Sequence, residues 1–216
     1  MMPTRLHCLG MGLQRIVAGM ACLALAVLLR HWLEAQMLRH MLLQLPLITA
    51  AGYLLAGPTP WMRHAAKFDE HGICGLTALL FVSAYWMIPR ALELSLGDAS
   101  VQMAKFTSLL LLGALLPGSF QRAGIIVQLF FLGNFCWMMA IVGIQYQNLP
   151  QRLCNAYLLD DQSITGAALV TAAIAIALVW CLRQAPTLFS TSQKTHIHVP
   201  PGTDSRLDLD PGSRLL

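Results

Sequence analysis

The segment between residues 31 and 46 carries the side chains most able to do chemistry, because polar and sulfur-containing residues interrupt an apolar run there. Gln36, His40 and Gln44 recur every four residues, which places them on one face of a helix. Met37 and Met41 form the adjoining stripe. Imidazole binds copper in either common oxidation state, and thioether sulfur selects the cuprous ion. His40 with Met37 and Met41 is therefore a candidate transient copper site.

Packing alone is a second interpretation of the same spacing, and the spacing taken by itself favours it. Polar side chains at membrane depth are costly when they face lipid, so this stripe should face the interior of a bundle or an aqueous pocket. His40 and Gln44 would then bond to neighbouring helices, while the methionines fill space. The copper and packing interpretations both remain open at this point.

Two acidic clusters precede later apolar runs. Asp69 and Glu70 stand before His71, and Asp160 is followed by Asp161. Carboxylates are stabilised at helix N-termini by the helix dipole, which is a sufficient structural role for both clusters. His71 then caps or packs. Asp160 and Asp161 could in addition supply oxygen ligands or attract a cation.

Six apolar stretches must position these groups. The hydrophobic fraction is 56% and the charged fraction 11%, against about 25% charged in an ordinary soluble domain. Since a membrane span needs about 20 apolar residues, we expect an all-α polytopic transmembrane bundle over residues 1–184. The six predicted spans are residues 13–29, 35–57, 72–88, 103–116, 123–145 and 164–182, with Pro117-Gly118 ending the fourth.

The remaining residues, 185–216, form a polar tail that we expect to be disordered, since it is rich in Pro, Ser, Thr and charge. His196 and His198 lie in this tail as an H-x-H pair, which is either incidental or a weak metal site. Six spans would put both termini on one side, and the basic residues of the tail favour the cytoplasm.

Several function classes find no support in the sequence. The net charge of +4 is small and spread over the loops, which argues against a nucleic-acid surface. There is no phosphate-binding glycine loop, nucleophile elbow or HExxH pair, so we do not expect an enzyme. The six cysteines include no CxxC pair, and neither a zinc site nor a disulfide framework is expected.

The order of the three clusters resembles the CtaG-like cytochrome c oxidase assembly factors, a family of bacterial multispan membrane proteins. The resemblance covers about residues 31 to 180. The matching motifs are residues 36–43 with Pro46 and the Gly57-Pro58-Thr59-Pro60 end, then Glu70-His71 and Tyr85-Trp86, then Asp161-Gln162 with Gly166. The chain departs from the family's pattern in lacking a second histidine near Gln36, and in having six expected spans where the family tends to have seven.

The resemblance implies an inner-membrane protein that assists copper delivery to a haem–copper oxidase. Copper would be held by His40 with Met37 and Met41, while His31, Asp160 and Asp161 would attract the ion or a periplasmic donor. The implied partners are oxidase subunits or that copper donor, together with membrane lipid. The family pattern also implicates His71, but the expected topology puts His71 on the inner side, so His40 ranks first.

Three alternatives remain beside this hypothesis. A non-metal accessory or structural subunit would pack against a respiratory complex through the small residues of the last span, around Gly166 and Ala173. A b-type haem protein would use His40 and His71 as ligands. A copper importer would raise the total copper of the cytosol.

Overall fold

The computed structural model describes residues 3–56, 69–149 and 157–195, and within them the side chains of residues 12–185. These parts of the chain are helices joined by short connections, and they contain no strand. The all-α prediction is therefore confirmed. The chain divides into two compact units between Ala177 and Leu178. The Lys105 side chain, its partners and the cavity described below all belong to the first unit.

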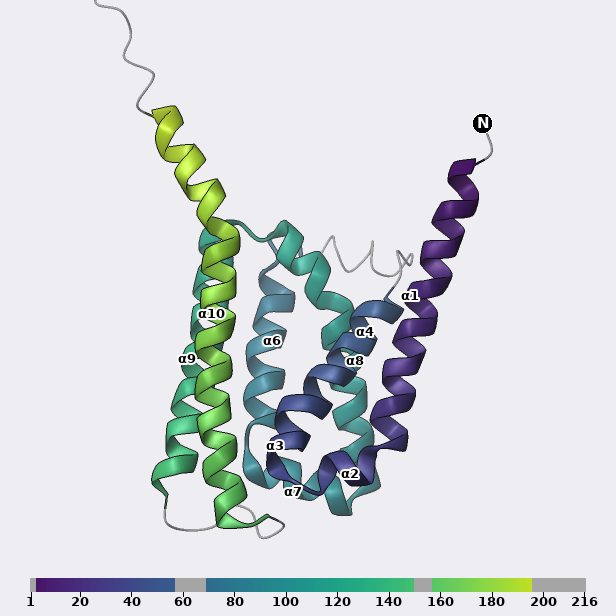
Figure 1. Ribbon diagram of the computed structural model, residues 1–216, viewed down its shortest axis with the longest axis vertical. Coiled ribbons are helices and arrows are strands. Elements are labelled where there is room, and N and C mark those ends of the chain that lie inside the picture. The colour runs from purple at the N-terminus through teal and green to yellow at the C-terminus, as the bar shows by residue number, and fades with distance from the viewer. Residues whose placement is uncertain (1–2, 57–68, 150–156, 196–216) are drawn as a thin grey trace, which may run out of the picture. The chain divides into compact units, whose positions relative to one another are not determined.

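The helices alternate in direction along the first unit (Figure 1). Their bounds are α1 Pro3–Leu28, α2 Arg30–Glu34, α3 Met37–Arg39, the π-helical segment η1 His40–Gln44, α4 Leu45–Leu55, α6 Ile73–Trp86, α7 Pro89–Gly97, α8 Ala99–Arg122, α9 Ile125–Asn148 and α10 Leu159–Thr195. The end of α1 and the start and end of α9 fall within three residues of the predicted limits, whereas α8 and α10 extend beyond theirs.

Three helices of the described chain are long and apolar enough to cross a membrane, namely α8, α9 and the Leu159–Ala185 part of α10. A fourth is added if α6 and α7, which bend by 73° at their junction, count as one span. A membrane protein is therefore the expected class, but six spans are not supported. The described apolar part of α1, Gly12–Leu28, is short of a full span.

The second predicted span, residues 35–57, is interrupted near its start, at Gln36. Gln36 adopts an extended conformation with φ −131° and ψ 140°, which interrupts the helix before Met37. Pro46 cannot donate a backbone hydrogen bond, and its ring crowds the preceding turn. The wider π-helical turn His40–Gln44 ends two residues before this proline. From Met37 the backbone is helical without a gap to Leu55, first as α3, then as η1 and then as the 11 residues of α4.

Pro117 does not end the fourth predicted span, because α8 continues through it to Arg122. Proline is tolerated inside such helices when neighbouring groups compensate for the lost backbone bond. The helix is thus longer than the predicted span. Asp98 fixes its start, since the carboxylate accepts a hydrogen bond from the Ser100 amide at 2.7 Å.

Two glycines bring α4 and α8 into backbone contact. A Cβ at Gly52 would lie 2.2 Å from the Leu110 carbonyl oxygen, and one at Gly113 would lie 1.9 Å from the carbonyl oxygen of Thr49. Only glycine allows this approach, and small residues serve the same purpose where helices of membrane proteins pack closely. The two helices run in the same direction (Figure 1). Groups about two turns before each glycine therefore meet side by side.

A polar cluster closes the end of the bundle where α6 begins and α8 ends. Arg122 binds Asp69 through Nη2 to Oδ2 at 2.9 Å and through Nε to the backbone oxygen at 2.6 Å. Ser119 donates to the same carboxylate, which also accepts from the Cys74 amide at 2.8 Å. The structural role predicted for an acidic residue at this helix start is confirmed for Asp69.

The last helix passes the predicted boundary at residue 185 and continues to Thr195, so residues 185–195 are helical where disorder was expected. Residues 196–216, with the H-x-H pair, lie outside the described residues. Within the first unit, a Cβ at Gly166 would lie 2.4 Å from the Gly143 carbonyl oxygen. The small-residue surface at Gly166 therefore packs α10 on α9 inside this chain.

Candidate cation site

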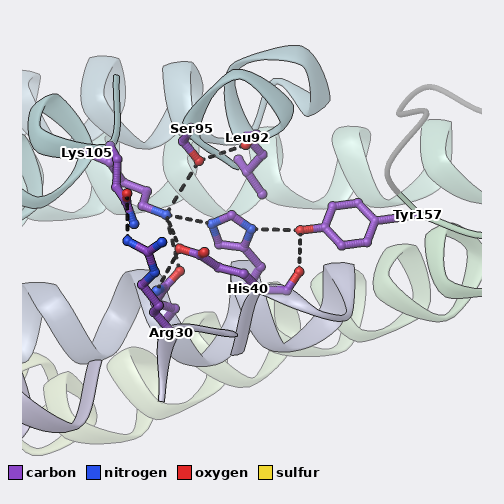
Figure 2. A network of polar contacts seen from close by, with 9 residues as sticks. Arg30, His40, Leu92, Ser95, Lys105 and Tyr157 are labelled. Atoms are coloured by element: carbon purple, nitrogen blue, oxygen red, sulfur yellow. Dashed lines mark hydrogen bonds and ion pairs between the residues drawn. The ribbon is translucent and has the colours of Figure 1, made fainter. Parts of the chain in front are cut away.

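The Lys105 ammonium group is fully buried and surrounded by hydrogen-bond acceptors (Figure 2). Its Nζ lies 3.0 Å from Glu34 Oε1, 3.0 Å from His40 Nε2, 3.3 Å from Gln44 Oε1 and 3.4 Å from Ser95 Oγ. We call these four residues the Lys105 cage. Three ammonium protons thus face four acceptors, one of which is a carboxylate.

The hydrogen bonds around His40 determine which ring nitrogen faces the ammonium as an acceptor. The Tyr157 hydroxyl donates to the Glu34 carbonyl at 3.0 Å, so its oxygen accepts from His40 Nδ1–H at 2.9 Å. His40 Nε2 then carries the lone pair and accepts from Lys105. Figure 2 shows the imidazole between the ammonium group and the phenol. The ring is neutral in this arrangement, and both nitrogens are used.

Breaks in the helices bring the cage together at one end of the bundle. Glu34 ends α2 immediately before the break at Gln36, and its Oε1 also accepts from Gln44 Nε2 at 3.2 Å. Ser95 lies on α7, which folds across that end through the 73° bend after α6. Lys105 comes from α8, about two turns before the close crossing at Gly113.

A second contact links α2 with α8. Arg30 Nη1 donates to Gln102 Oε1 at 3.1 Å, one turn of α8 before Lys105.

The Ser95 hydroxyl donates to the Leu92 carbonyl oxygen at 2.7 Å, so its oxygen is left to accept from Lys105. The cage is thus consistent in its donors and acceptors throughout.

The cage holds one positive charge against one negative charge. Lys105 and Glu34 form an ion pair at 3.0 Å, with side chains 0% and 9% exposed. A buried pair of this kind costs several kcal/mol of desolvation per ion, which good geometry and further hydrogen bonds must offset. The arrangement is chemically a cation site of one nitrogen and three oxygen acceptors, filled by a tethered ammonium ion.

The structure separates the residues predicted as metal ligands. His40 is buried in the cage, while Met37 and Met41 are buried in the hydrophobic core. The exposed residues among the predicted set are His31, His71 and Asp160, and Asp161 is half-buried. His71 directly precedes α6, at the opposite end of the helix from α7 and the cage (Figure 1). His40 and His71 are therefore not brought together.

The structure decides three details of the sequence prediction. His40 and Gln44 do share one face, since both reach the same ammonium group. Gln36 does not join them, because it is exposed and lies outside the helix. Asp160 and Asp161 lie in the first turn of α10, as predicted. Among the described residues, no three His, Cys, Asp or Glu side chains converge as a metal-binding group.

Sequence reasoning missed four of the groups that build the site: Glu34, Ser95, Lys105 and Tyr157. Lys105 carried a readable signal, because a lone lysine inside an apolar helix is expensive unless it faces the interior and is paired. Tyr157 and Ser95 carried no such signal, since their roles depend on how α7 and α10 return to the same end of the bundle.

Comparisons with protein-family models, with curated proteins and with solved structures find no match for this chain.

Proposed function

We propose that this chain is an inner-membrane assembly factor for a haem–copper oxidase, with copper as its cargo and the Lys105 cage as the cargo site. The observation that carries the proposal is the convergence of four acceptors on a single buried cation position. The motif order between residues 31 and 180, which resembles the CtaG-like factors, supplies the oxidase as client and a bacterial membrane as location.

Copper would enter the cage by replacing the ammonium group. His40 Nε2, the Glu34 carboxylate and the Gln44 amide oxygen already point at the same position. Nitrogen and oxygen donors of this kind suit the cupric ion. The thioethers of Met37 and Met41, which would select the cuprous ion, pack in the core. The donor set therefore favours cupric copper.

Lys105 gives the proposed site a means of release. The ammonium is tethered to α8 within reach of every acceptor that the cargo would use. Copper and the ammonium group therefore compete for the same acceptor atoms. The ammonium group would displace the metal whenever the Lys105 side chain moves back into the cage. A delivery protein needs weak, exchangeable binding of this kind, whereas a resident cofactor would need an unopposed site.

The cage would face the periplasm and the termini the cytoplasm. The cage lies at the end of the bundle where α2 and α7 lie and where α10 begins (Figure 1). His31 on α2 is exposed, and so is Asp160 on α10. These groups would attract the ion or a periplasmic copper donor to the outer mouth of the site.

A non-metal accessory subunit is the second candidate, and one observation favours it. Both nitrogens of His40 and every hydrogen bond of the cage are satisfied within the chain. A closed network of this kind is enough to lock α2, η1, α7 and α8 together without any cargo. In that case the oxidase would receive its copper normally whatever residue replaces His40, provided that the fold is kept.

A complementation experiment separates the two candidates. A strain lacking this protein receives the wild type, His40→Gln or the matched control His71→Gln, at equal membrane levels. Gln keeps an acceptor for Lys105 but removes the imidazole. We expect copper per oxidase to fall in the deletion strain and to be restored by wild type and His71→Gln only. Full restoration by His40→Gln would refute copper delivery through this site.

A further inference from the structure

A cavity of about 660 Å³ lies between α4, α6, α8, α9 and α10, within the first unit and apart from the Lys105 cage. Its volume is in the range of ligand sites, roughly 300–1,000 Å³. Representative lining residues are Leu45, Leu79, Leu112, Phe135 and Ile176, one from each helix. The cavity is thus a feature of the helix bundle as a whole and not of a single loop.

The lining offers almost nothing to a polar ligand. The Thr49 hydroxyl donates to the Leu45 carbonyl oxygen at 2.9 Å, and Ser83 donates to the Leu79 carbonyl oxygen. The indole of Trp86 donates to Ser108 Oγ at 3.0 Å. These donors are therefore already used inside the chain. A cavity lined in this way is unfavourable for water and binds hydrocarbon.

The shape of the cavity suits a chain-like molecule. Its lining follows α4 from Leu45 to Tyr53 and α8 from Leu109 to Phe120. At 1.5 Å per helical residue, the α8 wall alone extends about 16 Å along the helix axis. An extended alkyl chain can occupy such a slot while the protein and the bilayer exclude water from it.

A cation lies beside one end of this lining. The Arg15 guanidinium is 5.6 Å from the centre of the Tyr53 ring, and its Nη2 is 3.5 Å from the Tyr53 carbonyl oxygen. Tyr53 is half exposed and lines the cavity. A chain lying in the cavity would thus bring a head group within reach of a positive charge.

We propose that this cavity binds one acyl chain of an anionic phospholipid, with the head group near Arg15. The proposal depends on the apolar lining, the elongated shape and the charge beside Tyr53. It does not depend on copper, so it stands or falls separately from the function proposed above. The bound lipid would fill the bundle between the α4–α8 pair and the α9–α10 pair.

Native mass spectrometry of the full chain, released from mild detergent with its membrane lipids, tests this site. We expect one phospholipid per wild-type chain. Ala172→Phe puts a ring into the cavity and should lower the lipid occupancy about tenfold, a change that corresponds to one decade in affinity. The matched control is Ala175→Phe, an exposed position on the same helix that does not line the cavity. It should leave occupancy unchanged.

Two further variants keep the test decisive. Ala50→Phe fills the cavity from α4 and should repeat the effect if Ala172→Phe does not fold. Arg15→Gln should retain a lipid but lose the preference for anionic over zwitterionic head groups. Equal lipid retention by wild type and both filled variants would overturn the proposal. Retention of a free fatty acid or a neutral lipid alone would overturn it as well.

Discussion

Lys105 and His40 depend on each other for their positions in the interior of this protein. The ammonium supplies the proton that the His40 Nε2 lone pair accepts, and Tyr157 holds the opposite ring nitrogen. Glu34 supplies the balancing charge. An ionisable group inside a membrane is costly without a partner, so each of these residues limits which substitutions the others tolerate.

Removal of the lysine charge should destabilise the protein strongly. In Lys105→Met the Glu34 carboxylate is left buried without its cation, a change that typically costs about 3–5 kcal/mol. The double variant Glu34→Gln/Lys105→Met removes both charges and should recover most of that loss. Thermal unfolding in detergent, followed by circular dichroism, measures both variants. A single variant as stable as wild type would contradict the ion pair described here.

The same pair shows how far the sequence could lead. The spacing of His40 and Gln44 correctly predicted a shared inward face, because helical periodicity is a local property. Neither the partner of His40 nor the Lys105 cage could be predicted, since Lys105 and Tyr157 lie 65 and 117 residues away. Their meeting depends on helix crossings that no local pattern encodes.

At the scale of the elements, glycines and prolines decide where the polar groups meet. Gly52 and Gly113 let the backbones of α4 and α8 touch, while Pro46 follows the π-helical turn that carries His40. Composition correctly gave helices and apolar character. It could not show that residues 35–57 break at Gln36, because a buried helix and a broken one have the same hydropathy.

Substitution of the crossing glycine should be far more harmful than that of an exposed one. Gly113→Ala places a Cβ where the Thr49 carbonyl oxygen lies, so α4 and α8 must separate. Overpacking of this kind costs about 1–3 kcal/mol. Gly133→Ala on α9 has open space around it and should be neutral or slightly stabilising, because alanine favours helix. If the two variants unfold at the same midpoint temperature, the close crossing of α4 and α8 is disproved.

The Asp69–Arg122 pair predicts how acid affects the end of the bundle remote from the cage. Burial alone would raise the pKa of the Asp69 carboxyl, but hydrogen bonds from Ser119, Arg122 and the Cys74 amide, with the Arg122 charge, hold the pKa below its ordinary 3.8. A carboxyl with a lowered pKa stabilises the fold above its unfolded-state pKa, and this contribution is lost as pH falls through the folded-state pKa.

The difference in stability between wild type and Asp69→Asn should therefore be constant from pH 7 to about pH 5 and shrink below about pH 4. Thermal unfolding across this range measures it, with the exposed Glu70→Gln as control. A difference that already disappears at pH 6 would mean that the carboxylate is not held by Arg122 and Ser119.

In the whole molecule, three consecutive helices are long enough to span a membrane. Their order along the chain determines on which side of the membrane each helix end would lie. If α8, α9 and α10 each cross the bilayer, the start of α8 and the start of α10 share one face, and the α8–α9 turn lies on the other. Hydropathy could predict that these helices enter the membrane. It overestimated the number of spans, because the run at residues 35–57 is interrupted at Gln36 and α6 has only 14 residues before the 73° bend into α7.

Single cysteines introduced into a chain without its natural cysteines test this arrangement. Ser100→Cys, Gly124→Cys and Leu158→Cys all replace exposed residues at helix ends. In intact cells we expect an impermeant maleimide to label positions 100 and 158, and position 124 only after permeabilisation. Labelling of positions 100 and 158 from opposite faces would rule out the three crossings.

Copper binding by purified Lys105→Met is the most direct test of the Lys105 cage as a cation site. The full chain carries His196→Gln and His198→Gln, so that the tail pair cannot take up metal, and cupric ion is titrated at equilibrium. We predict one copper per chain in Lys105→Met, binding about 100-fold weaker or more in the chain that keeps Lys105, and loss of binding when His40→Gln is added. No copper in Lys105→Met that is folded by circular dichroism, or equal copper after His40→Gln, would contradict the cation site.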